Sequence, residues 1–346
     1  MLDNRKIRIL IVDDSAIVRK ILTEALSGEP DMEVVGTAPD PFVARDKILT
    51  LRPDVLTLDI EMPRMDGLTF LKKLMHFHPL PTVVISSLAQ ASCGAAVQAL
   101  ESGAVEVLAK PGGPYSVGEL SQTLAAKIRA AASSHVRRSE PPRPVASTPT
   151  PPLRLLSRAP SGTIFAIGAS TGGTEAIACV LTKLPESSPA IVITQHIPPV
   201  FSKAFANRLN EICALEVREA ADGDVVRPGL ALIAPGDYHM VLRNSGGQYS
   251  VSIKTGPRVC YQRPSVDVLF SSVAEAAGKR AVGVLLTGMG SDGANGLLQM
   301  RRAGARTIAQ DEATCVVYGM PREAVALGAA AQILPLNSVA QAMLAG

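Results

Sequence analysis

The run Ile7-Arg8-Ile9-Leu10-Ile11-Val12-Asp13-Asp14 opens the chain with a mostly apolar stretch that ends in two acids. A nearly continuous apolar run of this length is typical of a parallel strand buried on both faces. The same pattern recurs up to about Ala131, with helical patterns between the apolar runs. The expected strands are residues 7–12, 32–36, 54–58, 82–86 and 105–109, with helices from about Ser15, over 41–51 and over 116–131. Five strands that alternate with helices predict a doubly wound parallel sheet.

Polar residues that suit one site follow several of these strands: they are Asp13, Asp14, Asp59, Ser86 and Lys110. In a parallel α/β sheet, ligands gather at the carboxyl ends of the strands. Three carboxylates supply the hard oxygen ligands that Mg²⁺ prefers, and they leave room for a phosphoryl group. A lysine ammonium and a serine hydroxyl can contact the phosphoryl oxygens. The pattern therefore predicts an aspartyl phosphorylation site beside a bound cation.

These residues, with Asp59-Ile-Glu-Met-Pro and Asp66-Gly67, closely resemble the receiver domains of bacterial response regulators over about residues 5–130. The resemblance implies a flavodoxin-like fold in which Asp59 accepts a phosphoryl group from a histidine kinase. It also implies that Asp13, Asp14 and Asp59 hold Mg²⁺, and that Ser86 and Lys110 relay the change.

The receiver pattern has three local features of its own. Ser86 replaces the commoner threonine-type switch residue, and Val107 occupies a position that is often aromatic in receivers. The bond from Lys110 to Pro111 is a candidate cis peptide, because only X-Pro bonds adopt cis at appreciable frequency. The aromatic relay usual in receivers is therefore not expected in its ordinary form.

A segment without helical or strand periodicity separates this half from the next. Residues 132–161 contain seven prolines, several arginines and one acid, Glu140. Prolines prevent an ordinary helix or central strand and keep a chain extended. We therefore expect a receiver domain over 1–131, a Pro/Arg-rich linker over 132–161 and a second domain over 162–346.

The second half returns to alternating strands and helices. Strands are expected over 164–167, 190–194, 281–286 and 306–309, and helices over 174–184, 201–211, 266–277 and up to Ala303. The middle is richer in strand patterns, over 231–234, 239–243 and 249–254, with turn residues between them. The pattern predicts a three-layer α/β/α domain with a mostly parallel sheet and an antiparallel excursion.

A possible nucleophile lies in Gly168-Ala169-Ser170-Thr171-Gly172, which fits G-x-S-x-G between an apolar strand and a helix. In that context the motif exposes a serine on a sharp turn, although a glycine-rich turn can also bind phosphate or merely reverse the chain. A serine nucleophile needs a base, and only His196 and His239 lie in this half. His196 follows a strand, as Ser170 does, whereas His239 follows a turn, so His196 is the better candidate.

The acid that orients the histidine is also expected at a strand end. Asp292 meets this condition in Thr287-Gly-Met-Gly-Ser-Asp-Gly293. Sequence spacing does not exclude the other acids of this half: Asp222, Asp224, Asp237, Asp267 and Asp311. The order Ser, His, Asp also differs from the Ser, acid, His order of α/β-hydrolases, which argues against that fold.

The segments Ile167–Gly173, Gln195–Pro198 and Leu286–Gly293, with Ala234–Asp237, resemble the catalytic domain of chemotaxis protein-glutamate methylesterases. The resemblance implies that Ser170 is the nucleophile, His196 the general base and acid, and Asp292 its orienter. The backbone N–H groups of Thr171 and Met289 are oxyanion candidates. The implied substrates are glutamate γ-methyl esters on chemoreceptor signalling helices, with glutamine deamidation as a related activity and no cofactor for hydrolysis.

The presence of the receiver and methylesterase patterns on one chain suggests an enzyme that is activated when Asp59 is phosphorylated. One alternative is a receiver-controlled signalling adaptor without catalysis, and another is a DNA-binding response regulator. The formal net charge is +3, and no dense Lys/Arg stripe or recognition helix is evident, which disfavours nucleic acid as a partner. Scattered cysteines and the lack of a signal peptide or an apolar run long enough to span a bilayer indicate a cytoplasmic protein.

Overall fold

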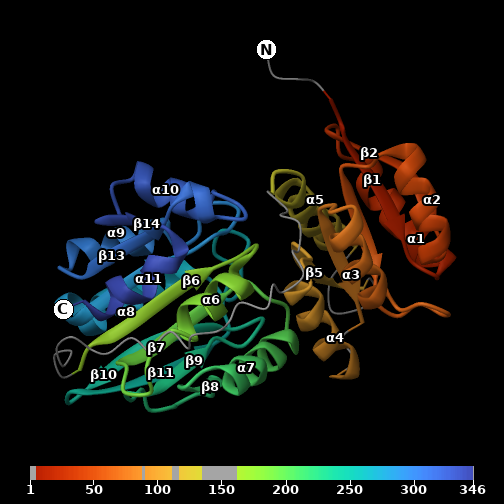
Figure 1. The fold of residues 1–346 in the computed structure, drawn as a ribbon. Helices are drawn as coiled ribbons and strands as arrows, with labels where there is room; N and C mark the ends of the chain where they lie inside the picture. Colours follow the sequence, from red (N-terminus) through yellow and green to blue (C-terminus); the bar gives the residue numbers. More distant parts are fainter. Residues whose placement is uncertain (1–4, 88–89, 111–116, 135–161, 346) are drawn as a thin grey trace. The chain divides into compact units, whose positions relative to one another are not determined.

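The structure is a computed structural model that describes residues 5–87, 90–110, 117–134 and 162–345. The chain divides into two compact units, Met1–Val145 and Ala146–Gly346, and each contains its own parallel sheet (Figure 1). Most of the expected linker and the Lys110–Pro111 bond lie outside the described residues. The domain boundaries at 131 and 161 therefore stay a prediction.

The first unit confirms the expected five-stranded parallel sheet, with strand order β2-β1-β3-β4-β5. Helices follow the strands in regular alternation, including α3 and α4, whose positions the sequence pattern did not specify. The elements are β1 (Ile7–Val12), α1 (Ala16–Ser27), β2 (Met32–Ala38), α2 (Pro41–Leu51), β3 (Val55–Asp59), α3 (Gly67–Phe77), β4 (Thr82–Ser86), α4 (Gln90–Glu101), β5 (Glu106–Ala109) and α5 (Val117–Ala132).

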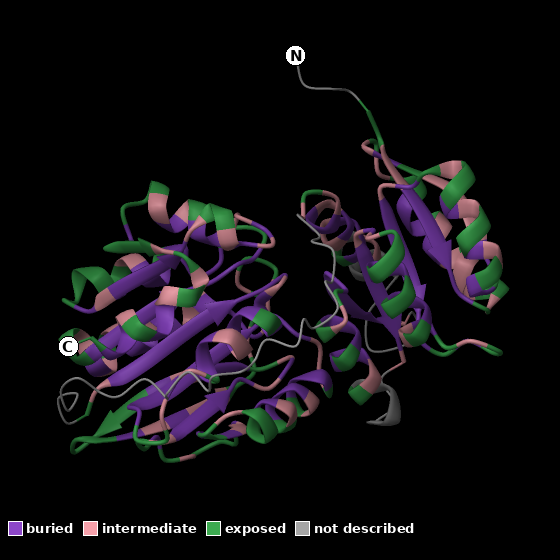
Figure 2. Ribbon diagram, in the orientation of Figure 1, coloured by how far each residue is buried: buried purple, intermediate pink, exposed green. Residues whose placement is uncertain are grey.

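Local chemistry explains where these helices begin. The side chains of Ser15, Asp40 and Asp66 accept hydrogen bonds from the first backbone N–H groups of α1, α2 and α3. Such N-caps satisfy donors that have no partner within the helix. Strands β3, β4 and β5 are buried along their whole length, as their apolar sequences predict (Figure 2). Their carboxyl ends therefore deliver polar side chains at the rim of a dry sheet.

The second unit contains a seven-stranded parallel sheet with strand order β14-β13-β12-β6-β7-β9-β8. Its elements are β6 (Ile164–Ala169), α6 (Gly173–Leu181), β7 (Ala190–Gln195), α7 (Phe201–Ile212), β8 (Glu216–Glu219), β9 (Leu230–Ile233), β10 (His239–Ser245), β11 (Gln248–Lys254), α8 (Val266–Ala277), β12 (Ala281–Leu285), α9 (Ala294–Arg302), β13 (Arg306–Gln310), α10 (Met320–Ala326), β14 (Gln332–Leu334) and α11 (Leu336–Leu344). Helix α6 contacts α7 and α11, whereas α9 contacts α8 and α10. These two helix layers enclose the sheet, as the predicted three-layer fold requires.

The antiparallel excursion is a separate hairpin. Strands β10 and β11 pair with each other and not with the main sheet, and β10 packs on α8. Residues 231–234, expected in the strand-rich middle, instead contribute β9 to the parallel sheet. Strand β8 was not anticipated because its sequence, Glu-Val-Arg-Glu, offers a single apolar residue.

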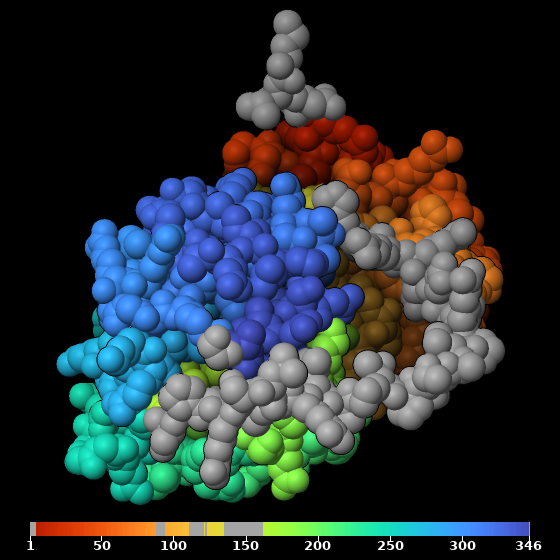
Figure 3. Space-filling view, turned by 60° about the vertical axis from the view of Figure 1, so that its left-hand side comes forward, coloured from red at the N-terminus to blue at the C-terminus, as the bar shows by residue number. Residues whose placement is uncertain are grey.

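The second sheet grows outward from its centre. From β6 the chain adds β7, β9 and β8 on one side, and later β12, β13 and β14 on the other. In the space-filling view the blue C-terminal segments and the green and cyan middle segments accordingly occupy different sides of this unit (Figure 3). The order of strands reverses beside β6, which is where α/β sheets bind their ligands.

Among the described residues, every helix is too short or too polar to cross a lipid bilayer.

Candidate active site

The carboxylates of the first unit form a compact cluster. One oxygen each from Asp13, Asp14 and Asp59 lies within 4.8 Å of the others. The Lys110 Nζ lies 2.7 Å from Asp59 Oδ2 and 3.8 Å from Asp13 Oδ2. Burial raises the pKa of Asp59 to about 6, although the hydrogen bond from Lys110 opposes the shift. Burial also raises the pKa of Asp13.

This cluster has the properties that a divalent cation needs. The Oδ2 of Asp13 is buried and accepts no hydrogen bond from any described residue. Lys110 supplies one positive charge against three carboxylates, so the cluster carries excess negative charge in a partly dry site. Carboxylate oxygens in this arrangement fit Mg²⁺, which needs only one or two protein carboxylates and retains several waters.

Ser86 and Lys110 end neighbouring strands of the same sheet. The Lys110 N–H donates to Ser86 O over 2.8 Å, and the buried Ser86 hydroxyl donates to Ser87 O over 3.4 Å. The structure thus brings Lys110 into contact with Asp59, and places Ser86 on the adjacent strand end.

In the second unit, three adjacent strands bring Ser170 and His196 together. Ala169 of β6 lies opposite Gln195 of β7, so the next residues on each strand, Ser170 and His196, are neighbours. His196 N–H donates to Ala169 O over 3.1 Å, and Ser170 N–H donates to Thr287 O over 3.0 Å. These bonds extend the sheet pairing past the last strand residues. Because neighbouring strands lie about 4.8 Å apart, residues 170 and 196 share one rim of the sheet.

His196 contacts Asp292, which comes from the loop after β12. The His196 Nε2 and Asp292 Oδ2 atoms are 2.7 Å apart, and the two residues are 5% and 2% exposed. Asp292 also accepts hydrogen bonds from Ser265 Oγ and from the backbone N–H groups of Val266 and Asp267, at the start of α8. Burial alone would raise the pKa of Asp292, but the hydrogen bond and charge of His196, with these N–H donors, hold it below its usual value.

The ionised Asp292 determines the tautomer of His196. A carboxylate only accepts hydrogen bonds, so the proton lies on Nε2 and the lone pair on Nδ1. The Nδ1 atom is buried and has no hydrogen-bond partner among the described residues. In trypsin-type triads the two ring nitrogens have the opposite roles. No hydrogen bond between the Ser170 hydroxyl and the His196 ring is present in the described part of the chain, and such bonds often form fully only with substrate bound.

The other histidine and acids have different partners. The His239 ring bonds Pro257 O and accepts from Ser265 N. The carboxylates of the five competing acids contact, respectively, Ile253 N–H (Asp222), Arg218 (Asp224), Arg263 (Asp237), Gly296 N–H (Asp267) and Thr314 (Asp311). Among the described acids, Asp292 is the one whose carboxylate bonds His196.

The loops that carry the oxyanion candidates pack directly on Ser170. A Cβ atom at Gly288 would lie 2.7 Å from the Ser170 Cβ, so the following residue, Met289, begins beside the serine. Thr171 is buried, and its carbonyl accepts from the Thr287 hydroxyl over 3.0 Å. Met289 is 37% exposed. Both backbone N–H candidates are therefore next to the serine.

Sequence reasoning missed three buried residues that support this site: Gln195, Ser265 and Thr287. Ser265 precedes the apolar run of α8, which is the usual signal of an N-cap. Gln195 and Thr287 are polar residues at the ends of buried strands, the position from which the other candidates were chosen. Their hydrogen bonds go to backbone carbonyls, and no sequence pattern predicts which carbonyls these are.

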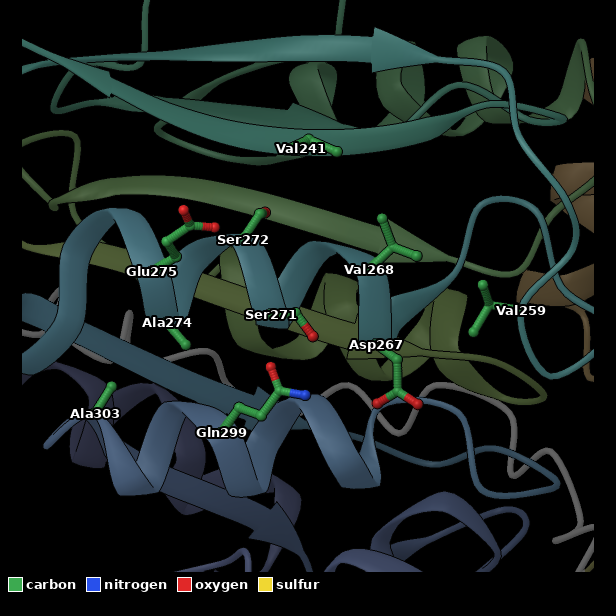
Figure 4. Close-up of a pocket in the computed structure, with 10 residues that line it drawn as sticks. All are labelled: Val241, Val259, Asp267, Val268, Ser271, Ser272, Ala274, Glu275, Gln299 and Ala303. Carbon is green, nitrogen blue, oxygen red and sulfur yellow. The ribbon is translucent and has the colours of Figure 1, made fainter.

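Two further features near Asp292 do not form part of this chemistry. A groove of about 690 Å³ lies along α8 and α9, where Asp267, Ser271 and Gln299 point between the helices (Figure 4), but neither Ser170 nor His196 lines it. One potential ligand atom each from Cys260, Asp267 and Asp292 also lies within 4.8 Å of the others. Each Asp292 oxygen already accepts two hydrogen bonds, which fills its lone pairs, so this group does not suit a metal.

Comparisons with known proteins match both halves of the chain. The family model described as CheB methylesterase matches residues 165–343, and the response regulator receiver domain model matches residues 9–122. A protein-glutamate methylesterase/protein-glutamine glutaminase of Syntrophus aciditrophicus is 58% identical over 335 residues, 97% of each chain. One from Escherichia coli O157:H7 is 54% identical over 98% of this chain and 97% of its own. The crystal structure of the Thermotoga maritima CheB methylesterase catalytic domain matches with a TM-score of 0.52 and 38% identity, over 53% of this chain and 98% of that chain.

Proposed function

The chain belongs to the CheB methylesterase family, and from that premise we propose that it hydrolyses glutamate γ-methyl esters on chemoreceptor signalling helices and releases methanol. The observation that carries the proposal is the His196–Asp292 bond, 2.7 Å long, on the sheet rim that also carries Ser170. The names of the relatives, which describe both methylesterase and glutaminase activity, support the same reaction class.

In the first half-reaction the Ser170 Oγ attacks the ester carbonyl, and His196 Nδ1 takes the serine proton. The imidazolium that forms is stabilised by Asp292, whose pKa is lowered by the hydrogen bond and charge of His196 and by the Asp267 and Val266 N–H groups. The Thr171 and Met289 N–H groups would stabilise the oxyanion. When the tetrahedral intermediate collapses, the carbon–oxygen bond to methoxide breaks and His196 returns the proton, so methanol leaves an acyl-Ser170.

In the second half-reaction a water attacks the acyl-serine while His196 again acts as the base. Collapse releases Ser170 and a glutamate carboxylate. A glutamine side chain passes through the same tetrahedral oxyanion and differs in releasing ammonia, so deamidation requires no additional group. This reaction needs no cofactor.

The receiver unit would control this chemistry. We assign Asp59 as the acceptor of a phosphoryl group from a histidine kinase, with Lys110 against the phosphoryl oxygens and Ser86 as the switch hydroxyl. Asp13, Asp14 and Asp59 would hold Mg²⁺, which when bound supplies charge neutralisation for phosphoryl transfer. Phosphorylation replaces the Asp59 carboxylate by an acyl phosphate of charge about −2, and so adds about one negative charge and new acceptor oxygens at this rim. A cytoplasmic location agrees with these partners and stays a prediction.

Methanol release from a methylated receptor preparation tests the esterase. The wild-type chain and a Ser187→Ala control, which changes an exposed loop serine, are expected to release methanol. Ser170→Ala is expected to release none above background. Equal rates above background for Ser170→Ala and wild type would remove Ser170 from the mechanism, whereas background release from both would leave the adaptor hypothesis.

Activation is tested with a small-molecule phosphodonor such as acetyl phosphate with Mg²⁺. The wild-type rate is expected to rise, whereas the rate of Asp59→Asn stays at its basal value because the acceptor oxygen is missing. If the two chains respond equally, control through Asp59 is wrong.

A further inference from the structure

Gln195 makes two contacts that connect the proposed nucleophile to its base. Its side-chain Nε2 donates to Ser170 O over 2.8 Å and to His196 O over 3.2 Å. The residue is 2% exposed, so water does not compete for these bonds. A buried amide that bridges two adjacent strand ends holds both ends in a fixed relation.

The direction of this amide is determined by its surroundings. If oxygen and nitrogen were exchanged, the amide oxygen would face two carbonyl oxygens, which repel it. The Oε1 atom therefore points the other way, toward Gly173 at the start of α6, where a Cβ would lie only 2.2 Å away. No described residue donates a hydrogen bond to Oε1. The positive end of the helix dipole favours an oxygen at this position.

Holding the Ser170 carbonyl also fixes the next N–H group. Ser170 O accepts from Gln195 Nε2 and, over 2.7 Å, from Gly173 N–H. A trans peptide is planar, with its C=O and N–H pointing in opposite directions. Because these two donors hold the carbonyl on one side, the Thr171 N–H is directed to the opposite side.

The peptide that carries the second oxyanion candidate, the Met289 N–H, is held in the same way. Gly288 O accepts from Gly319 N–H over 3.0 Å and from Met320 N–H over 2.8 Å, which directs the Met289 N–H away from both. In this case both donors are backbone groups at the start of α10. For the Ser170 carbonyl, one of the two donors is the Gln195 side chain. Substitution of Gln195 removes this donor and leaves the residues of the Ser170 loop unchanged.

We propose that Gln195 is a positioning residue that orients the Ser170–Thr171 peptide, and with it the Thr171 N–H, toward the developing oxyanion. The role rests on the proposed serine hydrolysis. Loss of an oxyanion donor lowers kcat by about 10²- to 10³-fold in serine hydrolases. A donor that is still present but misdirected should lose only part of its stabilisation of the oxyanion. We therefore expect Gln195→Met to lower kcat by about 10- to 100-fold. KM should stay close to wild type, because the oxyanion forms only in the transition state.

The experiment measures kcat and KM of the full chain for methanol release, and the rate of Ser170 acylation by p-nitrophenyl acetate. The ester probe requires the same oxyanion but no receptor, so it tests Gln195 even if the receptor is not the substrate. Gln299→Met, at an exposed position of α9, is the matched control and should keep wild-type rates. All rates are corrected for the folded fraction measured by circular dichroism.

Gln195→Glu separates positioning from a general structural effect. A neutral glutamic acid can donate an O–H to the Ser170 carbonyl, whereas its carboxylate repels that oxygen. Relative to wild type, the acylation rate of Gln195→Glu should therefore recover as pH falls and decline as pH rises. The proposal is overturned if Gln195→Met retains kcat within threefold, if KM changes instead of kcat, or if Gln195→Glu follows the wild-type pH profile.

Discussion

His196 bonds a carboxylate that is itself held at the start of α8. Asp292 accepts four hydrogen bonds, from His196, Ser265, Val266 and Asp267, so its position and charge are both fixed. With Nε2 committed to Asp292, only Nδ1 is left to accept the serine proton in the proposed mechanism. The tautomer is thus decided by a residue almost a hundred positions away in the chain.

Replacing Asp292 by Asn tests this assignment. The asparagine amide can donate to the ring, which would place the proton on Nδ1 and remove the base. We expect kcat for ester hydrolysis to fall on the order of 10³- to 10⁴-fold with little change in KM, by analogy with the same change in the trypsin triad. Steady-state kinetics at neutral pH measure this, and a loss of less than tenfold would contradict the tautomer assignment.

At the scale of elements, the start of α6 lies so close to β6 and β7 that it requires glycine. A Cβ at Gly173 would lie 2.2 Å from Gln195 Oε1 and 2.6 Å from the Ala169 Cβ. Alanine gains about 1 kcal/mol of helix propensity over glycine, but overpacking a dense core costs about 1–3 kcal/mol. The steric term should therefore dominate.

Gly173→Ala is expected to lower the free energy of unfolding of the second unit by about 1 kcal/mol or more. Gly94→Ala is the matched control, because Gly94 lies within α4 and its added Cβ meets no atom within 4 Å. That change should stabilise by up to about 1 kcal/mol. Urea unfolding followed by circular dichroism measures both, and stabilisation by Gly173→Ala would refute the close packing described here.

Helix α5 is tied to the segment before β2 by one arginine. Arg129 donates to Asp31 over 2.6 and 2.7 Å and to Glu29 over 2.5 Å. The hydrogen bond from Arg129 lowers the pKa of Asp31. A carboxyl whose folded pKa is depressed adds stability above its unfolded pKa of about 4 and loses it as pH falls through the folded value.

Arg129→Met should therefore destabilise the first unit at pH 7 and have a progressively smaller effect below about pH 4. Because Asp31 is 45% exposed, solvent screening limits the loss at pH 7 to about 1 kcal/mol. Arg45→Met, which breaks a largely exposed pair with Asp46, serves as the control and should change stability by less than about 0.5 kcal/mol. An Arg129 effect that is independent of pH would show that the contact is not electrostatic.

For the whole molecule, the presence of two separate cores predicts two unfolding transitions. Mg²⁺ should bind the native cluster of Asp13, Asp14 and Asp59 and not the unfolded chain. At about ten times its Kd, such a ligand stabilises the native state by about 1.4 kcal/mol. Mg²⁺ should therefore raise the midpoint of the receiver transition, and EDTA should reverse the shift, while the transition of residues 162–346 does not move.

Differential scanning calorimetry of the full chain measures both midpoints. Asp13→Asn removes one negative charge from the ligand set and relieves repulsion, so its receiver transition should be at least as stable without metal and should respond less to Mg²⁺. A Mg²⁺ response that persists in this variant, or that moves both transitions equally, would contradict the assigned cation site.

Much of the fold was predictable because its signals are local. Apolar runs such as residues 7–12 and 164–167 identified buried parallel strands, and the change of pattern near Ser15 marked a helix start that the structure contains. Strand β8 escaped prediction because neighbouring β9 and α7, and not its own sequence, provide its apolar environment. Residues 231–234 do form an apolar run, and it is their pairing with β7 and β8 that places them in the parallel sheet.

The sequence by itself determined that two parallel α/β sheets would carry acids, a serine and a histidine at their strand ends, since an apolar run followed by a polar residue is a short-range pattern. Only the tertiary structure decided which acid meets His196, which ring nitrogen is left as base, and that Gln195 holds the Ser170 carbonyl. These outcomes depend on strand order and register, which bring residues 168–173, 195–196 and 286–292 to one rim. Pairing over such separations is set by the packing of the whole sheet, and no local sequence pattern encodes it.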